Sequence, residues 1–352
     1  MQKMNNEKKN NQPQPAKASL LGRFGGAWTY YLKLIRVPNL LFLALTQFLM
    51  YWAVIVPILG LYGLEASIGR ELITLILATV SITAGGYVIN DYFDTKIDAV
   101  NRPEKVIVGK IIDKTKVMRF YQGLTAFGIG CGLGFALMAR NTTLAFIFLV
   151  IPGLLWFYSS NYKRMFMIGN LAVAFCAMLS VLIVALAEVA FLQTHIAFLK
   201  DSFILYGCNA FSPNLWQSVS QIYTWIGGFA LFAFVLTWIR EIIKDMEDER
   251  GDREVECRTM PIKWGITNTK IFLLVLTSLT IVVLFIVGNF IIPFDGMLSV
   301  WYINIAVIAP LVVLEYLIFK AETPADFRQA STLTKIIMLM GVLYSLVFWY
   351  LM

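Results

Sequence analysis

Nine long apolar runs occupy most of the chain, and they restrict its possible folds more than any other feature. Each run approaches or exceeds the roughly 20 residues that an α-helix needs to cross the hydrocarbon core of a bilayer. The runs are continuous and do not alternate between apolar and polar residues, so they predict helices rather than the strands of a membrane barrel. The predicted spans cover residues 39–62, 72–90, 117–138, 142–160, 168–192, 222–243, 271–293, 300–319 and 332–352.

The composition supports a membrane protein. Of the 352 residues, 59% are hydrophobic and only 14% are charged, whereas a soluble globular domain has about 25% charged residues. The excess of apolar residues excludes a water-soluble enzyme, and the single histidine, His195, argues against a histidine-based triad or zinc site. We expect an all-α integral membrane protein with a polar, basic tail and interfacial segment over residues 1–36 and a nine-helix membrane domain over residues 37–352.

The basic residues predict the orientation in the membrane. With the N-terminus in the cytoplasm, nine spans leave only Arg70, Arg140 and Lys200 outside, so 26 of the 29 lysines and arginines lie on the cytoplasmic side. Cytoplasmic loops of membrane proteins show this excess. The net charge of +7 is therefore explained by topology and not by nucleic-acid binding.

Two acidic segments share one spacing. They lie at the predicted cytoplasmic ends of the second and sixth spans, and both have the pattern D-x-x-D-x-x-x-D. On a helix this spacing places the carboxylates on one face. An ordinary solvated acidic turn explains one such segment, but not two at the same membrane face. The first aspartate row consists of Asn90, Asp91, Asp94 and Asp98, and the second aspartate row of Asp245, Asp248 and Asp252.

This arrangement suits a divalent cation. Like charges on one helix face repel each other, so each row is expected to bind a positive partner. Mg²⁺ prefers oxygen ligands and typically combines one or two carboxylates with water and substrate phosphates. Two rows that face each other are therefore suited to two Mg²⁺ ions that bridge to a diphosphate.

Basic and hydroxyl groups accompany the two rows. Arginine binds phosphate oxygens in a bidentate way, and lysine supplies a point charge. For Lys163, which ends the fourth span, membrane orientation is an equally good explanation. The candidates for binding the diphosphate are Arg102, Lys105, Lys244, Tyr158, Ser159 and Lys163.

At these residues the chain resembles the UbiA superfamily of intramembrane prenyltransferases. The segment N-D-Y-F-D-T-K-I-D, which starts at Asn90, is similar to the family's NDxxDxxxD motif. The segment R-E-I-I-K-D-M-E-D-E-R-G-D, which ends at Asp252, is similar to its second aspartate-rich motif. Asn101-Arg102-Pro103 resembles the family's NRP turn, and the similarity extends from about Val37 to the C-terminus.

The resemblance implies a bundle of nine transmembrane helices with two aspartate-rich cytoplasmic loops, and a Mg²⁺-dependent transfer of a prenyl group. A prenyl diphosphate ionises to an allylic cation, which a carbon or oxygen atom of the acceptor attacks. Tyr158 is a candidate for stabilising the cation through its ring. The acceptor stays open between an aromatic compound and a glycerol-phosphate ether lipid, and so does the prenyl length. The implied metal ligands are Asn90, Asp94, Asp98, Asp245, Asp248 and Asp252, with Asp91 also in the catalytic motif.

Two other classes of membrane protein share some of these features. A cation-coupled transporter also has carboxylates in its helices, but its site usually lies near the bilayer midplane on broken helices. The two aspartate rows lie instead at predicted cytoplasmic ends. A CDP-alcohol phosphotransferase has the pattern D-x-x-D-G-x-x-A-R, whereas Thr95 follows Asp94 here.

Small residues predict where helices approach each other closely. Gly130 and Gly134 form a GxxxG pair in the third predicted span. Such pairs let two helix backbones pack tightly in lipid, so we expect this face to contact a neighbouring helix.

Overall fold

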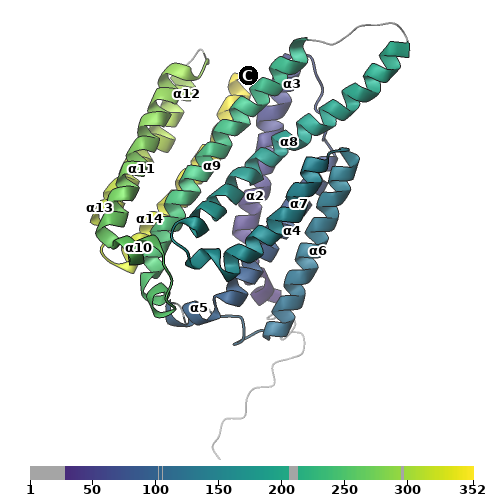
Figure 1. Cartoon of the computed structure of the whole chain (residues 1–352). Helices are drawn as coiled ribbons and strands as arrows, with labels where there is room; N and C mark the ends of the chain where they lie inside the picture. The colour runs from purple at the N-terminus through teal and green to yellow at the C-terminus, as the bar shows by residue number, and fades with distance from the viewer. Residues whose placement is uncertain (1–27, 102, 105, 206–212, 295–296) are drawn as a thin grey trace, which may run out of the picture.

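The computed structural model describes residues 28–101, 103–104, 106–205, 213–294 and 297–352. These residues form a helical bundle without strands (Figure 1). Nine of the described helical segments are long and apolar enough to cross a membrane, which confirms the predicted number of spans. The helices are α2 (Val37–Leu49), α3 (Val56–Leu61), α4 (Glu71–Phe93), α5 (Thr95–Asn101), α6 (Lys114–Met138), α7 (Thr142–Ser160), α8 (Ile168–Leu205), α9 (Pro213–Glu254), α10 (Met260–Trp264), α11 (Ile266–Ile286), α12 (Met297–Tyr302), α13 (Ala309–Lys320) and α14 (Pro324–Leu351).

The sixth span differs most from its prediction. The apolar run covers residues 222–243, but α9 continues to Glu254. The additional turns contain Lys, Asp, Met, Glu and Arg, and most of these residues favour helix, so the helix does not end where the apolar run ends. The second aspartate row therefore lies on a helix, and the prediction that it lies in a loop is wrong.

The first aspartate row is also helical. Asn90 and Asp91 lie in the last turn of α4, Asp94 is the residue that ends this helix, and Asp98 lies in α5. Helix α5 runs in a different direction from α4 (Figure 1), so Asp98 lies on another helix than Asp91. The expected loop is again wrong, because the row is divided between two helices.

Two hydrophobic clusters hold the bundle together, and α9 contributes to both. Ile222, Ile226 and Ala230 pack with residues of α4, α6, α7 and α8, whereas Leu236, Ile239 and Ile243 pack with α11, α13 and α14. In Figure 1, α9 accordingly lies between these two groups of helices. This central position fixes the second aspartate row at the end of the bundle where α5 and α10 lie.

The close packing of α6 uses other glycines than predicted. Around Gly130 and Gly134 no described atom lies within 4 Å of the position that a Cβ would take. At Gly128 a Cβ would lie 2.9 Å from the backbone nitrogen of Ile82, and at Gly132 it would overlap the ring of Phe148. The close approach to α4 and α7 is therefore made by the Gly128 and Gly132 pair, and the prediction for Gly130 and Gly134 is wrong.

A buried carboxylate fixes the connection between α3 and α4. Glu188 of α8 is fully buried and accepts hydrogen bonds from the backbone N–H groups of Ser67 and Ile68 at 2.6 and 3.2 Å. These N–H groups precede α4 and have no partner within a helix. Glu188 therefore has a structural role that the sequence analysis missed.

Candidate active site

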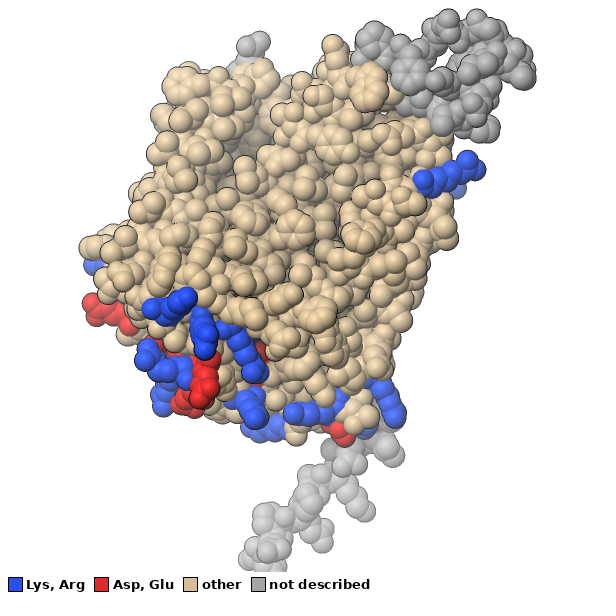
Figure 2. Space-filling model, viewed as in Figure 1, with Lys and Arg blue, Asp and Glu red and all other residues tan. Residues whose placement is uncertain are grey.

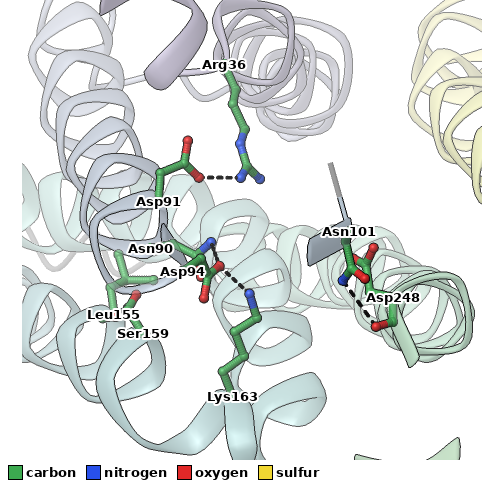
Figure 3. Close-up of polar contacts among 9 residues, drawn as sticks. All are labelled: Arg36, Asn90, Asp91, Asp94, Asn101, Leu155, Ser159, Lys163 and Asp248. Atoms are coloured by element: carbon green, nitrogen blue, oxygen red, sulfur yellow. Dashed lines mark hydrogen bonds and ion pairs between the residues drawn. The ribbon is translucent and has the colours of Figure 1, made fainter. Parts of the chain in front are cut away.

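The charged side chains gather at one end of the bundle (Figure 2). In the first aspartate row, Asp94 is only 4% exposed and accepts a hydrogen bond from Asn90 Nδ2 at 2.7 Å. Lys163, from the segment after α7, forms an ion pair with the same oxygen, Asp94 Oδ2 (Figure 3). Burial alone would lower the pKa of Lys163, but the charge of Asp94 and the hydrogen bond to it, together with Tyr158 and Asp252, outweigh burial and raise that pKa. Asp94 is therefore neutralised by a charged lysine.

Arg36 approaches the same row from the other side. Its guanidinium donates to Asp91 Oδ1 at 2.8 Å and lies 4.9 Å from the centre of the Tyr87 ring. Figure 3 shows Arg36 and Lys163 extending toward the row from opposite directions. The sequence gives no signal for Arg36, which lies directly before α2 and is one of many basic residues near the N-terminus.

An asparagine connects the two rows. Asn101, the last residue of α5, donates from Nδ2 to the backbone oxygen of Asp248 at 3.2 Å. Its Oδ1 accepts from the backbone N–H of Gly251 at 2.9 Å. Both partners belong to α9, so one side chain fixes α5 against the helix of the second aspartate row (Figure 3).

The second aspartate row is held from α8. Asn170 donates from Nδ2 to Asp245 Oδ2 at 2.8 Å, and Asp252 is only 5% exposed. One turn before Asp245, Glu241 is buried and accepts from Arg240 at 2.5 Å. Polar side chains thus follow one side of α9 for several turns.

Electrostatic interactions show that the two rows converge. Lys163 interacts with Asp94 of the first row and with Asp252 of the second. Tyr158 interacts with Lys163, Asp94 and Asp245. Burial raises the pKa of Asp98 to about 6, the other carboxylates of its row act in the same direction, and Lys163 and Lys244 oppose them. Residues of the two rows therefore lie near each other, and Lys163 and Tyr158 interact with both rows.

The donors of this site fit Mg²⁺ in type. All of them are carboxylate or amide oxygens, which are the ligands of hard cations. Asn90 Oδ1 is buried and has no hydrogen-bond partner among the described residues. The described residues contain no group of three acidic, histidine or cysteine side chains arranged closely enough to hold a metal alone. A cation at this site would therefore complete its coordination with water and substrate phosphate oxygens.

The other predicted diphosphate ligands have different positions. Ser159 is buried, and its hydroxyl donates to the Leu155 carbonyl of its own helix at 2.9 Å (Figure 3). Lys244 is partly buried on α9 and interacts with Asp98 and Asp252. Arg102 and Lys105 lie outside the described residues.

The structure adds five residues that the predicted site lacked. Asn101, Arg240 and Glu241 lie within a few turns of the rows along the chain, and their amide or charged side chains could have been selected from the sequence. Asn170 had no such signal, since it is one polar residue at the start of an apolar run. The added residues are Arg36, Asn101, Asn170, Arg240 and Glu241.

The chain is similar in sequence to known prenyltransferases. A family model described as the UbiA prenyltransferase family matches residues 53–340. A digeranylgeranylglyceryl phosphate synthase from Methanopyrus kandleri is 29% identical over 290 residues, which cover 80% of this chain and 88% of that protein. A second, from Saccharolobus solfataricus, is 29% identical over 319 residues, which cover 89% and 94%.

Solved structures show the same fold at low sequence identity. An apo UbiA homolog from Aeropyrum pernix K1 matches with a TM-score of 0.59 and 11% identity, over 87% of this chain and 96% of that chain. A UbiA homolog from Archaeoglobus fulgidus bound to DMAPP and Mg²⁺ matches with a TM-score of 0.50 and 15% identity, over 90% and 99%.

Proposed function

Because the chain belongs to the UbiA prenyltransferase family, we propose that it transfers the prenyl group of a prenyl diphosphate to a hydroxyl group of a glyceryl phosphate lipid. The observation on which this depends most is the convergence of two aspartate rows around Lys163. A site of this kind combines oxygen ligands for divalent cations with a cation for a phosphate oxygen. A departing diphosphate requires both, because its negative charge must be neutralised as the C–O bond breaks.

The residues of the site have separable roles in this reaction. Asn90, Asp94 and Asp98, together with Asp245, Asp248 and Asp252, would hold Mg²⁺, and we propose two ions. When bound, Mg²⁺ supplies the positive charge that neutralises the diphosphate as a leaving group. Arg102 and Lys105 are further proposed ligands of the diphosphate.

Lys163 and Tyr158 lie between the rows. The ion pair of Lys163 with Asp94 keeps an ammonium group in the site, where it would bind a phosphate oxygen. We propose that the ring of Tyr158 stabilises the allylic cation. Loss of the diphosphate breaks its C–O bond, the acceptor oxygen forms the new bond to the same carbon, and the hydroxyl proton passes to an oxygen base of the site.

The relatives support a glyceryl phosphate acceptor. The similar proteins that cover most of this chain are named digeranylgeranylglyceryl phosphate synthases. Such a product contains two geranylgeranyl groups on one glyceryl phosphate. The last transfer that forms it therefore adds a geranylgeranyl group to a glyceryl phosphate that already bears the other. We propose geranylgeranyl diphosphate and geranylgeranylglyceryl phosphate as substrates, with an aromatic quinone precursor as the second candidate acceptor.

We propose that the site faces the cytoplasm, as does the N-terminus. The aspartate rows lie at the end of the bundle where most of the charged side chains gather (Figure 2). The excess of lysine and arginine at this end supports a cytoplasmic location.

The metal assignment predicts which carboxylates are essential. Asp94→Asn and Asp248→Asn should each lower prenyl transfer by at least about 100-fold, because each removes the charge of a proposed metal ligand. The matched control is Glu254→Gln on the same helix as Asp248, at an exposed position outside the row, and it should retain wild-type activity. The measurement is transfer from labelled geranylgeranyl diphosphate by purified protein with Mg²⁺.

Two results would contradict this assignment. Full activity in excess EDTA would exclude a divalent cation, and equal loss in Glu254→Gln would show that the row has no special role. Transfer to 4-hydroxybenzoate but not to geranylgeranylglyceryl phosphate would overturn the proposed acceptor alone.

A further inference from the structure

Two cations belong to helices that are long and apolar enough to cross a membrane. Arg240 belongs to the span Leu215–Glu254 and Lys335 to the span Pro324–Leu351. Charged residues inside spans are rare, usually face the interior of a bundle, and mark sites for polar ligands. Among the described residues, Lys335 has no contact with the metal site, and Arg240 is connected to it only through its ion pair with Glu241.

These cations belong to a cluster. The charges that act most strongly on Lys335 are, in descending order, those of Arg240, Arg36, Lys244 and the carboxylate of Glu241. Glu241 in turn interacts with Arg240, Lys244 and Arg36, and also with Lys163. Helices α9 and α14 and the residue before α2 thus bring positive charges to one place.

In the described part of the chain, some cations of the cluster have no close carboxylate partner. Arg36 pairs with Asp91, and Arg240 pairs with Glu241. Among the described residues, neither Lys244 nor Lys335 has a carboxylate within 4.0 Å. Repulsion between such cations is unfavourable near lipid, so the cluster is suited to an anion.

One donor of the cluster is buried and unused. Arg240 Nε has no hydrogen-bond partner in the described part of the chain, although another nitrogen of its guanidinium is bound to Glu241. A buried donor without an acceptor is unfavourable, and guanidinium groups bind phosphate oxygens with two nitrogens at once. A phosphate group supplies acceptor oxygens of this kind.

We propose that Arg36, Arg240 and Lys335 bind the phosphate of the acceptor lipid, separately from the diphosphate. This inference rests on the proposed function for the identity of the ligand. Arg240 lies eight residues before Asp248, which corresponds to about 12 Å along a helix, so the cluster is farther from the bundle end than the metal site.

The chemistry of the reaction requires two anion sites of this kind. The attacking hydroxyl and the phosphate belong to the same glycerol, so the acceptor phosphate must lie near the diphosphate while binding to other groups. Lys244 lies between Arg240 and Asp248 on α9 and reduces the repulsion between the two anions.

Membrane orientation does not explain the cluster. Arg240 and Lys335 are two of the 26 basic residues assigned to the cytoplasmic side, and the other 24 satisfy the positive-inside rule without them. It requires neither a cation inside a span nor an arginine nitrogen that is buried without a partner.

A binding experiment without metal tests the inference. The probes are a monoalkylglyceryl phosphate and the matched monoalkylglycerol, titrated in EDTA against the full-length protein by isothermal titration calorimetry. The wild type should bind the phosphate form at least about tenfold more tightly, and Lys335→Gln and Arg240→Gln should each reduce this preference about tenfold. In Lys335→Gln the affinity for geranylgeranyl diphosphate with Mg²⁺ should change by less than about twofold.

Matched controls separate the cluster from general charge effects. Lys116→Gln and Arg119→Gln remove exposed cations of α6 and should keep the wild-type preference. Arg240→Lys keeps the positive charge beside Glu241 and should retain part of the preference for the phosphate probe. This variant distinguishes loss of phosphate binding from misfolding of Arg240→Gln.

The outcomes distinguish this inference from the proposed function. Equal affinity of the wild type for both probes, or loss of diphosphate binding in Lys335→Gln, would overturn the acceptor-phosphate site. A phosphate preference that depends on Arg240 and Lys335, in a protein that transfers no prenyl group to geranylgeranylglyceryl phosphate, would support the anion site and overturn the proposed acceptor.

Discussion

At the scale of single residues, the geometry of the site depends on a side chain that has no place in the chemistry. Asn101 binds two backbone groups of α9, and Gly251 leaves the space that it occupies. A Cβ at Gly251 would lie 2.5 Å from both Asn101 Oδ1 and Nδ2. The glycine is therefore needed for the approach of α5 to α9, and with it for the distance between the two rows.

This contact predicts that Gly251→Ala impairs catalysis more than stability. The methyl group would displace Asn101 and shift the second aspartate row relative to the first, and misplacement by about 1 Å can lower the rate about 100-fold. The measurement is kcat for prenyl transfer together with Tm in detergent. Gly130→Ala on α6, where no described atom lies near the new Cβ, is the control and should keep both values. Wild-type kcat in Gly251→Ala would show that this contact does not position the rows.

The site residues differ in how well the sequence predicted them. The spacing of the two rows was visible because helical periodicity relates residues three and four apart, and electrostatic interactions across the site show that the rows converge. Arg36 and Asn170 were not visible, because tertiary structure alone brings these distant segments to the rows. The role of Ser159 was also not readable from sequence, since its hydroxyl bonds either to a ligand or, as found, to its own helix.

At the scale of helices, α6 shows that a GxxxG motif predicts close packing without predicting which glycines make the contact. Gly128, Gly130, Gly132 and Gly134 occur at every second position, so two GxxxG pairs lie on different faces of the helix. Sequence alone predicts that a small-residue face packs closely but does not decide which pair does so. In the structure Gly128 packs against Ile82 and Gly132 against Phe148, so this pair makes the close contact.

The packing of α6 predicts that valine destabilises the protein at Gly132 and is tolerated at Gly134. Gly132→Val should destabilise the protein by about 1–3 kcal/mol, because the new side chain would overlap Phe148, which is only 1% exposed. Gly134→Val on the open face should have little effect. Thermal unfolding in the same detergent provides the comparison. A lower Tm for Gly134→Val than for Gly132→Val would contradict the observed packing of α6.

At the scale of the whole molecule, the two rows form one site only if both lie at the same membrane face. The native cysteines do not provide a test of this. Cys257 is 3% exposed, and burial raises the pKa of its thiol to about 11, so little reactive thiolate is present near neutral pH. Introduced cysteines at exposed positions are needed, in a chain whose four cysteines are replaced by serine.

Five spans separate residue 65, which lies between α3 and α4, from the end of α9, so these two positions must lie on opposite sides of the membrane. Glu65 and Glu254 are both exposed. We expect a membrane-impermeant maleimide to label Glu65→Cys in intact cells and Glu254→Cys only after permeabilisation, because the excess of basic residues places the end of α9 in the cytoplasm. Labelling of Glu254→Cys in intact cells, and of Glu65→Cys only after permeabilisation, would reverse the proposed orientation. Both aspartate rows would still lie at one membrane face. Labelling of both positions from one side would contradict the five intervening spans, and with them the convergence of the two aspartate rows on one diphosphate.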